Sequence, residues 1–252
     1  MNKKNKRSVD KKFKIVLLFF LIIAILISGF NAYMIIRGAS EYNTGTDSYK
    51  QIHDMAVRKD ADPNDGRIDF ELLKSVNPDV IGWLSLENTV IDYPVVKGND
   101  NEYYLHHLYT GEWNSLGSLF VDYRNRDLFQ DQISVIYGHS MLNGSMFFLL
   151  ERYERQSFYE EHKQFIFETP DQVYILEPIA GRTVDAKIPF LQFNFGSDEE
   201  YKEYIEEFMK TSTFVSEAAF DHSDKTVMMI KCSDDFEDAR YVLLCKVNVP
   251  QN

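Results

Sequence analysis

From residue 77 onwards, the chain is a series of short apolar runs separated by polar turn residues. The runs are rich in β-branched and aromatic side chains and have the length of strands, a pattern typical of β-structure rather than of helices. About eight such runs at irregular spacing predict an antiparallel barrel or sandwich. They read VIGWLSL, VIDYPVV, GSLFVDY, QISVIYGH, QFIFET, QVYILEPIAG, KTVMMIKC and RYVLLCKVNV.

One segment between these runs, residues 197–210, has helical periodicity instead. Ser197 is a favourable N-cap residue, and acidic side chains follow it in the first turn, where they stabilise the helix dipole. An apolar face is expected from four side chains at helical spacing. These are Tyr201, Tyr204, Ile205 and Phe208. The predicted fold is therefore mainly β with inserted helices.

The N-terminus has a pattern of a different kind, in which basic residues precede a long apolar run. Residues 1–14 contain seven Lys or Arg, and residues 15–36 contain no charged residue. As a helix, this uncharged run spans roughly 33 Å, which is enough to cross a bilayer core. The basic side should stay in the cytoplasm. We therefore predict a single-pass protein of the cell membrane, with 1–14 as a cytoplasmic tail and 15–36 as a signal anchor.

A cleaved signal peptide is the alternative, because the strictly apolar residues 15–27 also have the length of an h-region. Small residues are poorly placed for cleavage, since a cut after Ala32 would put Phe30 at the −3 position. A retained anchor is therefore favoured. Under either interpretation, the residues after Arg37 lie outside the cell.

A polar segment, residues 37–76, separates the apolar run from the predicted β domain, residues 77–252. Its composition indicates an extracellular stalk with one short helix near residues 48–59, ended by an Asp-Pro-Asn-Asp-Gly turn. Asp69 is then expected to cap a second short helix that runs through about Ser75.

Composition and charge exclude several classes of function for this chain. The chain has 252 residues, of which 44% are hydrophobic and 26% charged, as expected for one globular domain with an appendage. After Arg37, 19 basic residues stand against 38 acidic ones, which argues against a nucleic-acid partner. Two cysteines are too few for a disulfide scaffold or a four-cysteine zinc site.

Candidate chemistry lies at the ends of predicted strands. KTVMMIKC ends at Cys232, and the returning run begins at Arg240, so an antiparallel pairing would set these residues opposite each other. A guanidinium beside a thiol stabilises the nucleophilic thiolate and is able to hold an oxyanion. His139 follows Gly138 at the end of another predicted strand, and histidine is the usual proton carrier for such a nucleophile.

No catalytic or metal-binding role is predicted for the remaining cysteine and histidines. In the predicted hairpin, Cys245 is roughly 17 Å from Cys232, too far for a disulfide. His106 and His107 are adjacent, so in a strand they would point to opposite faces, and no metal site is predicted for them. Three further histidines are expected at the surface: His53, His162 and His222.

Four segments resemble the class B sortases, cysteine transpeptidases of Gram-positive bacteria, in order and spacing. They are NPDVIGWLSLENTVIDYPVVKGNDNEYYLHH, GSLFVDYRN, VIYGHSMLNGSMF and CSDDFEDARYV. The resemblance implies an eight-stranded β-barrel with N-terminal helices and a helix inserted between the sixth and seventh strands. It also implies that Cys232 is the nucleophile, His139 the acid/base, and Arg240 the group that positions the substrate and steadies the oxyanion.

The implied reaction is acyl transfer without a metal or an organic cofactor. Cys232 cleaves a C-terminal sorting motif of a surface protein, similar to Asn-Pro-x-Thr-x, and an amine of a peptidoglycan precursor resolves the thioester. By the same resemblance, Asn101 and Leu105 are similar to substrate-groove residues. Strand alternation adds Ile230, which shares a face with Cys232.

The chain departs from the sortase pattern just before Cys232. Thr-Leu-x-Thr is usual there, whereas these positions read Met-Met-Ile-Lys. Alternation predicts that Lys231 lies on the face opposite Cys232 and is mostly solvated. The substitution keeps open a catalytically silent, sortase-like binding domain. A pilin-polymerising sortase, whose acceptor is a lysine of another protein, also stays open, whereas a papain-like protease is disfavoured because its cysteine precedes its histidine.

Overall fold

The structure is a computed structural model that describes residues 3–58, 66–126, 128–141, 143–185, 190–232 and 239–250. The side chains of residues 3–12, 232 and 239 are outside this description. The chain divides into two units, Met1–Thr44 and Gly45–Asn252.

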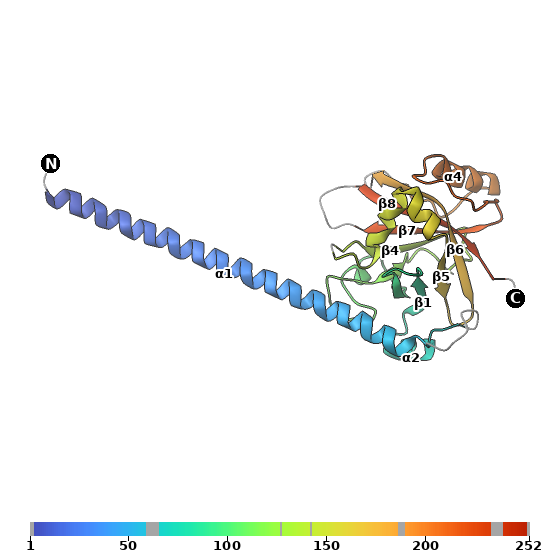
Figure 1. Ribbon diagram of the computed structural model, residues 1–252, viewed down its shortest axis with the longest axis horizontal. Coiled ribbons are helices and arrows are strands. Elements are labelled where there is room, and N and C mark those ends of the chain that lie inside the picture. The colour runs from blue at the N-terminus through green and yellow to red at the C-terminus, as the bar shows by residue number, and fades with distance from the viewer. Residues whose placement is uncertain are drawn as a thin grey trace. The chain divides into compact units, whose positions relative to one another are not determined.

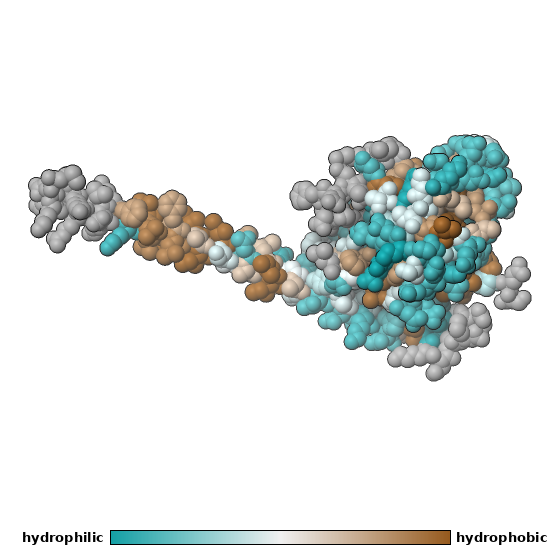
Figure 2. All heavy atoms as spheres, turned by 45° about the horizontal axis from the view of Figure 1, so that its top comes forward, coloured by the Kyte–Doolittle hydropathy of each residue, from teal (hydrophilic) through white to brown (hydrophobic). Residues whose placement is uncertain are grey.

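The first unit is helical and belongs to α1 (Lys3–Ala56). The part of this helix from Phe13 onwards is long and apolar enough to cross a membrane. Its apolar side chains are exposed and form a brown band along the helix in Figure 2. The length and the exposed apolar surface agree with the predicted anchor.

The prediction of a separate helix beginning near residue 48 is wrong, because α1 continues without a break to Ala56. No proline occurs in this stretch, and Gly38 and Gly45 each cost a helix only about 1 kcal/mol relative to alanine. In the second unit, Tyr49 and Ile52 of the same helix are buried. Tertiary packing of these last turns stabilises helix where composition alone indicated a stalk.

The second unit is built on a closed barrel of eight strands, and all eight predicted strands are present (Figure 1). Around the barrel the strand order is β1-β2-β3-β4-β7-β8-β6-β5. The strands are β1 (Val80–Ser85), β2 (Asp92–Val96), β3 (Leu119–Val121), β4 (Ile133–His139), β5 (Phe165–Glu168), β6 (Val173–Asp185), β7 (Lys225–Cys232) and β8 (Ala239–Asn248).

The expectation of a wholly antiparallel sheet is wrong at two places. β2 pairs with β3 in parallel, and β4 pairs with β7 in parallel. Parallel pairing needs a long crossover, and long connections separate both pairs: residues 97–118 in the first and residues 140–224 in the second. Because β4 and β7 run the same way, their C-terminal ends meet at one edge of the barrel.

Helices flank the strands, and the helix between the sixth and seventh strands is confirmed as α4 (Asp198–Lys210). The Ser197 hydroxyl accepts a hydrogen bond from the backbone N–H of Glu200, as a helix cap should. On the predicted apolar face, three side chains are buried and Tyr204 is half-buried. The other helices are α2 (Phe70–Val76), capped by Asp69 as predicted, η1 (Tyr103–Leu105), η2 (Phe147–Glu154) and α3 (Gln156–Glu161).

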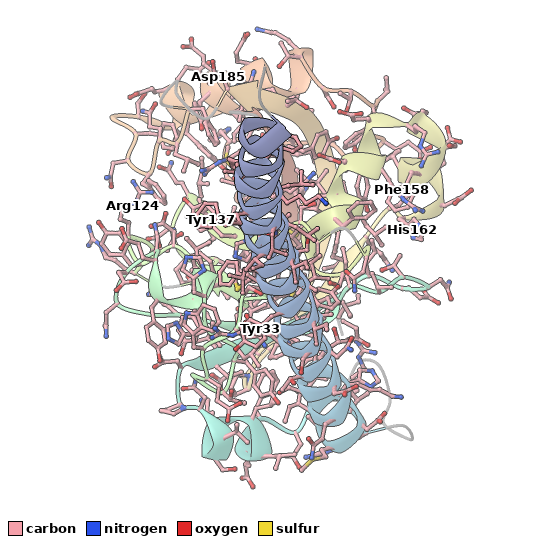
Figure 3. All side chains as sticks on the ribbon, turned by 90° about the vertical axis from the view of Figure 1, so that its left-hand side faces the viewer. Tyr33, Arg124, Tyr137, Phe158, His162 and Asp185 are labelled. Carbon is pink, nitrogen blue, oxygen red and sulfur yellow. The ribbon has the colours of Figure 1, made fainter. Side chains whose placement is uncertain are left out.

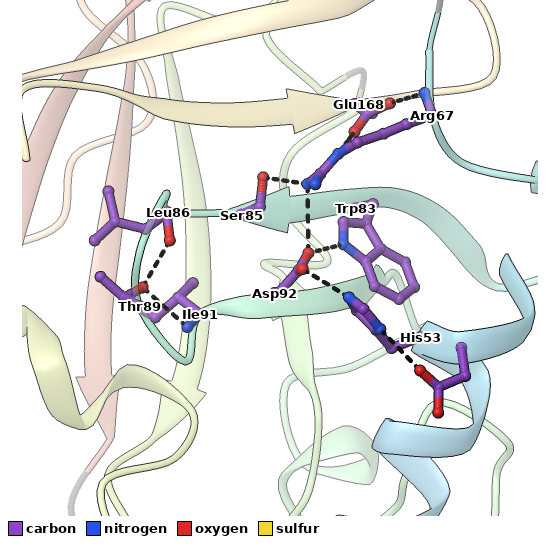
Figure 4. Close-up of polar contacts among 10 residues, drawn as sticks. His53, Arg67, Trp83, Ser85, Leu86, Thr89, Ile91, Asp92 and Glu168 are labelled. Atoms are coloured by element: carbon purple, nitrogen blue, oxygen red, sulfur yellow. Dashed lines mark hydrogen bonds and ion pairs between the residues drawn. The ribbon is translucent and has the colours of Figure 1, made fainter. Parts of the chain in front are cut away.

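A polar network, here called the Arg67 cluster, joins α1 and the chain before α2 to the barrel (Figure 4). Its centre is Glu168 of β5, which is 1% exposed and accepts hydrogen bonds from Arg67 Nε at 2.8 Å and from the Arg67 backbone N–H at 2.7 Å. The same guanidinium donates to Ser85 Oγ at 2.7 Å and pairs with Asp92 at 3.4 Å. Asp92 also receives the indole N–H of Trp83.

His53 of α1 completes the Arg67 cluster, with its Nε2 at 3.0 Å from Asp92 Oδ2. Side chains from α1, β1, β2 and β5 thus satisfy one another's charges and hydrogen bonds. The buried Glu168 carboxylate and the half-buried Asp92 carboxylate each meet a cationic or N–H partner, which is the condition for keeping such a group inside a protein. The cluster therefore fastens the end of α1 to the barrel.

Candidate active site

The edge where β4 and β7 end brings together two of the residues singled out in the sequence. In the parallel ladder, Tyr137 pairs with Ile230, Gly138 with Lys231, and His139 with Cys232. His139 and Cys232 are therefore neighbours in the sheet, although 92 residues separate them in the chain. Neighbouring backbone positions on adjacent strands are about 5 Å apart, which is within the reach of two side chains.

His139 is 3% exposed and is held by a backbone acceptor. Its Nε2 lies 2.6 Å from the carbonyl oxygen of Leu105, at the end of η1. A carbonyl oxygen only accepts, so Nε2 carries the hydrogen. In the neutral imidazole, Nδ1 is then the basic nitrogen, and it is the atom able to take up a proton during a reaction.

Gly117 packs directly against the His139 ring. Its φ is +59°, a conformation that side chains with a Cβ rarely adopt. A Cβ at this position would lie 2.8 Å from His139 Cδ2 and 2.5 Å from the carbonyl oxygen of Leu105. Both backbone conformation and space therefore require glycine here. The sequence pattern does not single out Gly117, because along the chain it is one glycine in an ordinary turn.

Arg240 lies near the start of β8 and is half-buried. β7 and β8 pair antiparallel, which confirms the predicted hairpin, and their ladder runs to the pair Ile230 and Val242. Two more residues in the same register would set Cys232 opposite Arg240. On its other side Arg240 pairs with Val184 of β6. The connection, residues 233–238, lies outside the described residues.

The three residues predicted to bind substrate have different surroundings. The Asn101 amide donates to Asp122 Oδ2 at 2.9 Å, and its carbonyl oxygen accepts from the Tyr123 backbone N–H at 3.1 Å, so it fastens two loops together. Leu105 is half-buried and contacts His139 through its carbonyl. Ile230 is completely buried and offers no open surface. A contact between any of them and substrate stays a prediction.

Asp122, which the sequence analysis did not single out, organises the loop after β3. Burial by itself raises the pKa of this carboxyl, but hydrogen bonds from Arg124 and Tyr137, together with the Arg124 charge, outweigh it, so the pKa lies below its ordinary value. Figure 3 labels both partners. The Arg124 guanidinium also stacks on Phe193, 4.2 Å from the ring centre. Arg124 thereby ties the loop after β3 to the segment before α4.

Lys231, next to the end of β7, is not mostly solvated as predicted. Its side chain is 12% exposed, and its ammonium pairs with Glu151 of η2. It neighbours Gly138 in the ladder, and a Cβ on Gly138 would meet Phe147, also of η2. Helix η2 therefore covers the face of the sheet on which Lys231 lies, and it supplies the counter-charge.

The second cysteine is structural. Cys245 lies in the middle of β8, paired with Val227 on one side and Pro178 on the other, and it is a free thiol. It is completely buried, and this burial raises the pKa of the thiol well above its ordinary value. A buried thiol of this kind is protonated and unreactive.

The described part of the chain contains no group of three or more His, Cys, Asp or Glu side chains placed to hold a metal ion. His107 stacks on Tyr103 at 3.8 Å, and its Nδ1 lies 2.6 Å from the Tyr103 carbonyl oxygen. His106 is exposed, with its ring 6.3 Å from that of His139. The two adjacent histidines therefore have different partners.

Comparison with known proteins gives two curated relatives, while no protein-family model matches the chain. The chain is 30% identical to sortase B of Listeria monocytogenes over 222 residues, which are 82% of this chain and 90% of that protein. It is 27% identical to sortase B of Staphylococcus aureus over 239 residues, 94% of this chain and 97% of the relative.

Solved structures agree with these relatives. A Staphylococcus aureus sortase B–substrate complex superposes with a TM-score of 0.73 at 26% identity, covering 84% of this chain and all of that one. A sortase B complexed with triglycine gives 0.68 at 30% identity, with 72% and 86% covered. Clostridium perfringens sortase B gives 0.67 at 32% identity, with 71% and 100% covered.

Proposed function

The chain belongs to the sortase B family, and from that premise we propose that Cys232, His139 and Arg240 form its catalytic site. Membership makes the protein a cysteine transpeptidase for surface proteins. Of its two cysteines, Cys245 is buried in a strand with a raised thiol pKa, which leaves Cys232 as the nucleophile. The observation that carries the proposal is the parallel register that pairs His139 with Cys232.

The proposed reaction has two stages. The Cys232 thiol gives its proton to Nδ1 of His139, and the resulting thiolate attacks a threonine carbonyl in a sorting motif similar to Asn-Pro-x-Thr-x. Arg240 holds the tetrahedral oxyanion. When the peptide C–N bond breaks, the leaving amine takes a proton from His139 and a thioester remains. An acceptor amine then attacks the thioester, His139 takes the amine proton, and the Cys232 thiolate leaves.

A peptide substrate and an amine acceptor are supported by the relatives. One was solved as a substrate complex and another with triglycine, a peptide with a free amine. For this chain we propose a sorting-signal peptide of a surface protein and the amine of a peptidoglycan precursor. The comparisons do not favour a pilin-polymerising sortase or a silent binding domain.

We also propose a location. The apolar stretch of α1 would cross the cell membrane once, with the basic residues 1–14 in the cytoplasm, residues 15–36 in the bilayer, and the barrel outside. Residues 37–76 would then connect the anchor to the catalytic domain, residues 77–252. Protease added to intact protoplasts should digest the barrel, and complete protection would contradict this orientation.

The cysteine assignment is tested by a matched pair of variants of the full-length protein in detergent micelles. With a quenched-fluorophore Asn-Pro-x-Thr-x peptide, Cys232→Ala should form no acyl-enzyme detectable by mass spectrometry. Cys245→Ala should form it almost as the wild type does, because it removes only a buried, protonated thiol. The reverse result would refute the assignment.

A further inference from the structure

Two backbone groups of one loop, the Leu105 carbonyl and Gly117, surround part of the His139 ring. Nε2 is bonded to the Leu105 carbonyl, and the ring edge at Cδ2 rests on Gly117. The two are themselves tied together, since the N–H of Ser118 donates to the Tyr104 carbonyl at 2.9 Å. Movement of the Gly117 backbone would therefore change both the ring contact and the position of its acceptor.

Helix α1 contacts this loop at Gly117 through the side chain of Tyr49. The Tyr49 hydroxyl donates to the Gly117 carbonyl oxygen at 2.7 Å and lies 3.0 Å from the Ser118 hydroxyl. Tyr49 is 5% exposed, and burial raises the pKa of its phenol, so it remains a donor throughout the physiological range. Its ring contacts those of Tyr93 and Tyr109, each with its centre 5.3 Å away.

We propose that Tyr49 is a positioning residue for His139, which it orients by fixing the Gly117 backbone. The proposal rests on the proposed role of His139 as the acid/base. Gly117 has neighbours on two sides: its carbonyl oxygen accepts the Tyr49 hydroxyl hydrogen bond, and a Cβ at this position would lie only 2.8 Å from His139 Cδ2. Buried groups packed this closely do not shift independently, so the hydroxyl constrains the ring without touching it.

One consequence concerns the predicted anchor. Tyr49 lies in α1, the helix whose N-terminal stretch is apolar enough to span a membrane. Under this proposal, the last turns of that helix help to position a catalytic residue, in addition to connecting the predicted anchor to the chain that follows.

The structure supplies a matched control for the test. Tyr109 also bonds to α1 through its hydroxyl, which donates to the Ser48 carbonyl at 3.2 Å and accepts from the Ser48 hydroxyl at 3.2 Å. Tyr49→Phe and Tyr109→Phe thus remove the same atom, and each removes contacts between α1 and the barrel. Only the first removes the bond to Gly117.

The experiment uses full-length protein in detergent micelles and the fluorogenic sorting peptide. Tyr49→Phe should lower kcat by roughly threefold to tenfold, the range expected for one hydrogen bond, and leave KM unchanged. Tyr109→Phe should leave kcat within about twofold of wild type, the scale of a lost contact that does not reach the site. Equal kcat in the two variants would overturn the proposal.

A second readout does not depend on turnover. In long-range ¹H–¹⁵N spectra of the imidazoles, wild-type His139 should show a hydrogen on Nε2, as the Leu105 carbonyl requires. The His139 resonances should move or broaden in Tyr49→Phe and stay in place in Tyr109→Phe. Unchanged His139 resonances in Tyr49→Phe would exclude a positioning role.

His139→Ala separates this inference from the proposed function. If that variant keeps wild-type turnover, the proposed role of His139 fails. If it is inactive while Tyr49→Phe retains full kcat, the proposed function stands and the positioning role fails.

Discussion

Two polar regions of the barrel unit are buried to a similar degree but are held differently. In the Arg67 cluster, Glu168 is 1% exposed and is paired with a guanidinium. At the end of β4, His139 is 3% exposed, and its Nε2 is held by the neutral carbonyl of Leu105. The guanidinium of Arg67 gives the Glu168 carboxylate both a counter-charge and a hydrogen-bond donor. The Leu105 carbonyl, by contrast, fixes the orientation of the His139 ring through one of its nitrogens.

The comparison separates a polar cluster that stabilises the fold, around Arg67, from a polar residue proposed to take part in the reaction, His139. The Arg67 cluster joins α1, β1, β2 and β5, so its loss should lower stability. The site at the ends of β4 and β7 carries the proposed acid/base, so its loss should lower the rate. Variants in each region should separate these two quantities.

The largest expected effect on stability is in the Arg67 cluster. Arg67→Met leaves the buried Glu168 carboxylate without its cation and should lower the free energy of unfolding by about 3 kcal/mol. Chemical denaturation followed by tryptophan fluorescence measures this loss. Adding Glu168→Gln to the same protein should recover part of it, because the remaining buried group is neutral. Turnover per folded molecule should not change in either variant, and a large drop would mean that the cluster also shapes the site.

Arg240 provides the corresponding test at the site. Its planar fork offers two donors at fixed geometry, which a lysine does not reproduce. Arg240→Lys should therefore lower kcat by roughly 10²-fold, the scale of a lost oxyanion donor. The free energy of unfolding should change little, because the residue is half-buried and keeps its charge. Near-wild-type turnover would mean that Arg240 is an ordinary strand residue.

Asp122 gives an intermediate, pH-dependent effect. Although burial opposes it, the hydrogen bonds and charge of Arg124 hold the pKa of the folded protein below the ordinary value. A depressed carboxyl pKa contributes stability that is fully present above the unfolded-state pKa, about 4, and is lost as the pH falls through the folded value. Denaturation between pH 7 and acid pH should show this loss in wild type and less of it in Asp122→Asn.

Tyr137→Phe is the milder control for Asp122. It removes one donor from the carboxylate and leaves Arg124 in place, so its acid loss of stability should lie between those of wild type and Asp122→Asn. Identical acid profiles in all three proteins would contradict the assigned cause of the lowered pKa.

The smallest effect is expected at Lys231. Its partner Glu151 is 46% exposed, so water screens the pair, and Lys231→Thr should cost about 1 kcal/mol or less in unfolding free energy. Turnover should change by less than about threefold, because the ammonium is engaged on the η2 side of the sheet. Glu151→Gln breaks the same pair from the other end and should behave alike. A large gain of activity in Lys231→Thr would show that the natural lysine suppresses catalysis.

Much of the fold was predictable because its signals are local. Each of the eight strands coincides with one apolar run, although β6 extends beyond its run to Asp185 and β8 begins one residue before its run, at Ala239. The cap residues Ser197 and Asp69 begin the helices expected of them. Pairing was not predictable from the same signals. A run of apolar residues indicates that a strand forms there. Contacts with strands that are distant in the sequence determine which strand it pairs with and whether the pairing is parallel or antiparallel.

The candidate site divides in the same way. The sequence by itself determined the nucleophile candidates, the histidine at a strand end, and the family resemblance, because residue type and spacing along the chain carry that information. The tertiary structure alone decided that β4 and β7 run in parallel and so bring His139 beside Cys232. It also decided that Gly117 supports the His139 ring, that Tyr49 holds Gly117, and that Lys231 pairs with η2. These contacts join residues remote in the chain, and they arise only when the barrel closes and α1 packs against it.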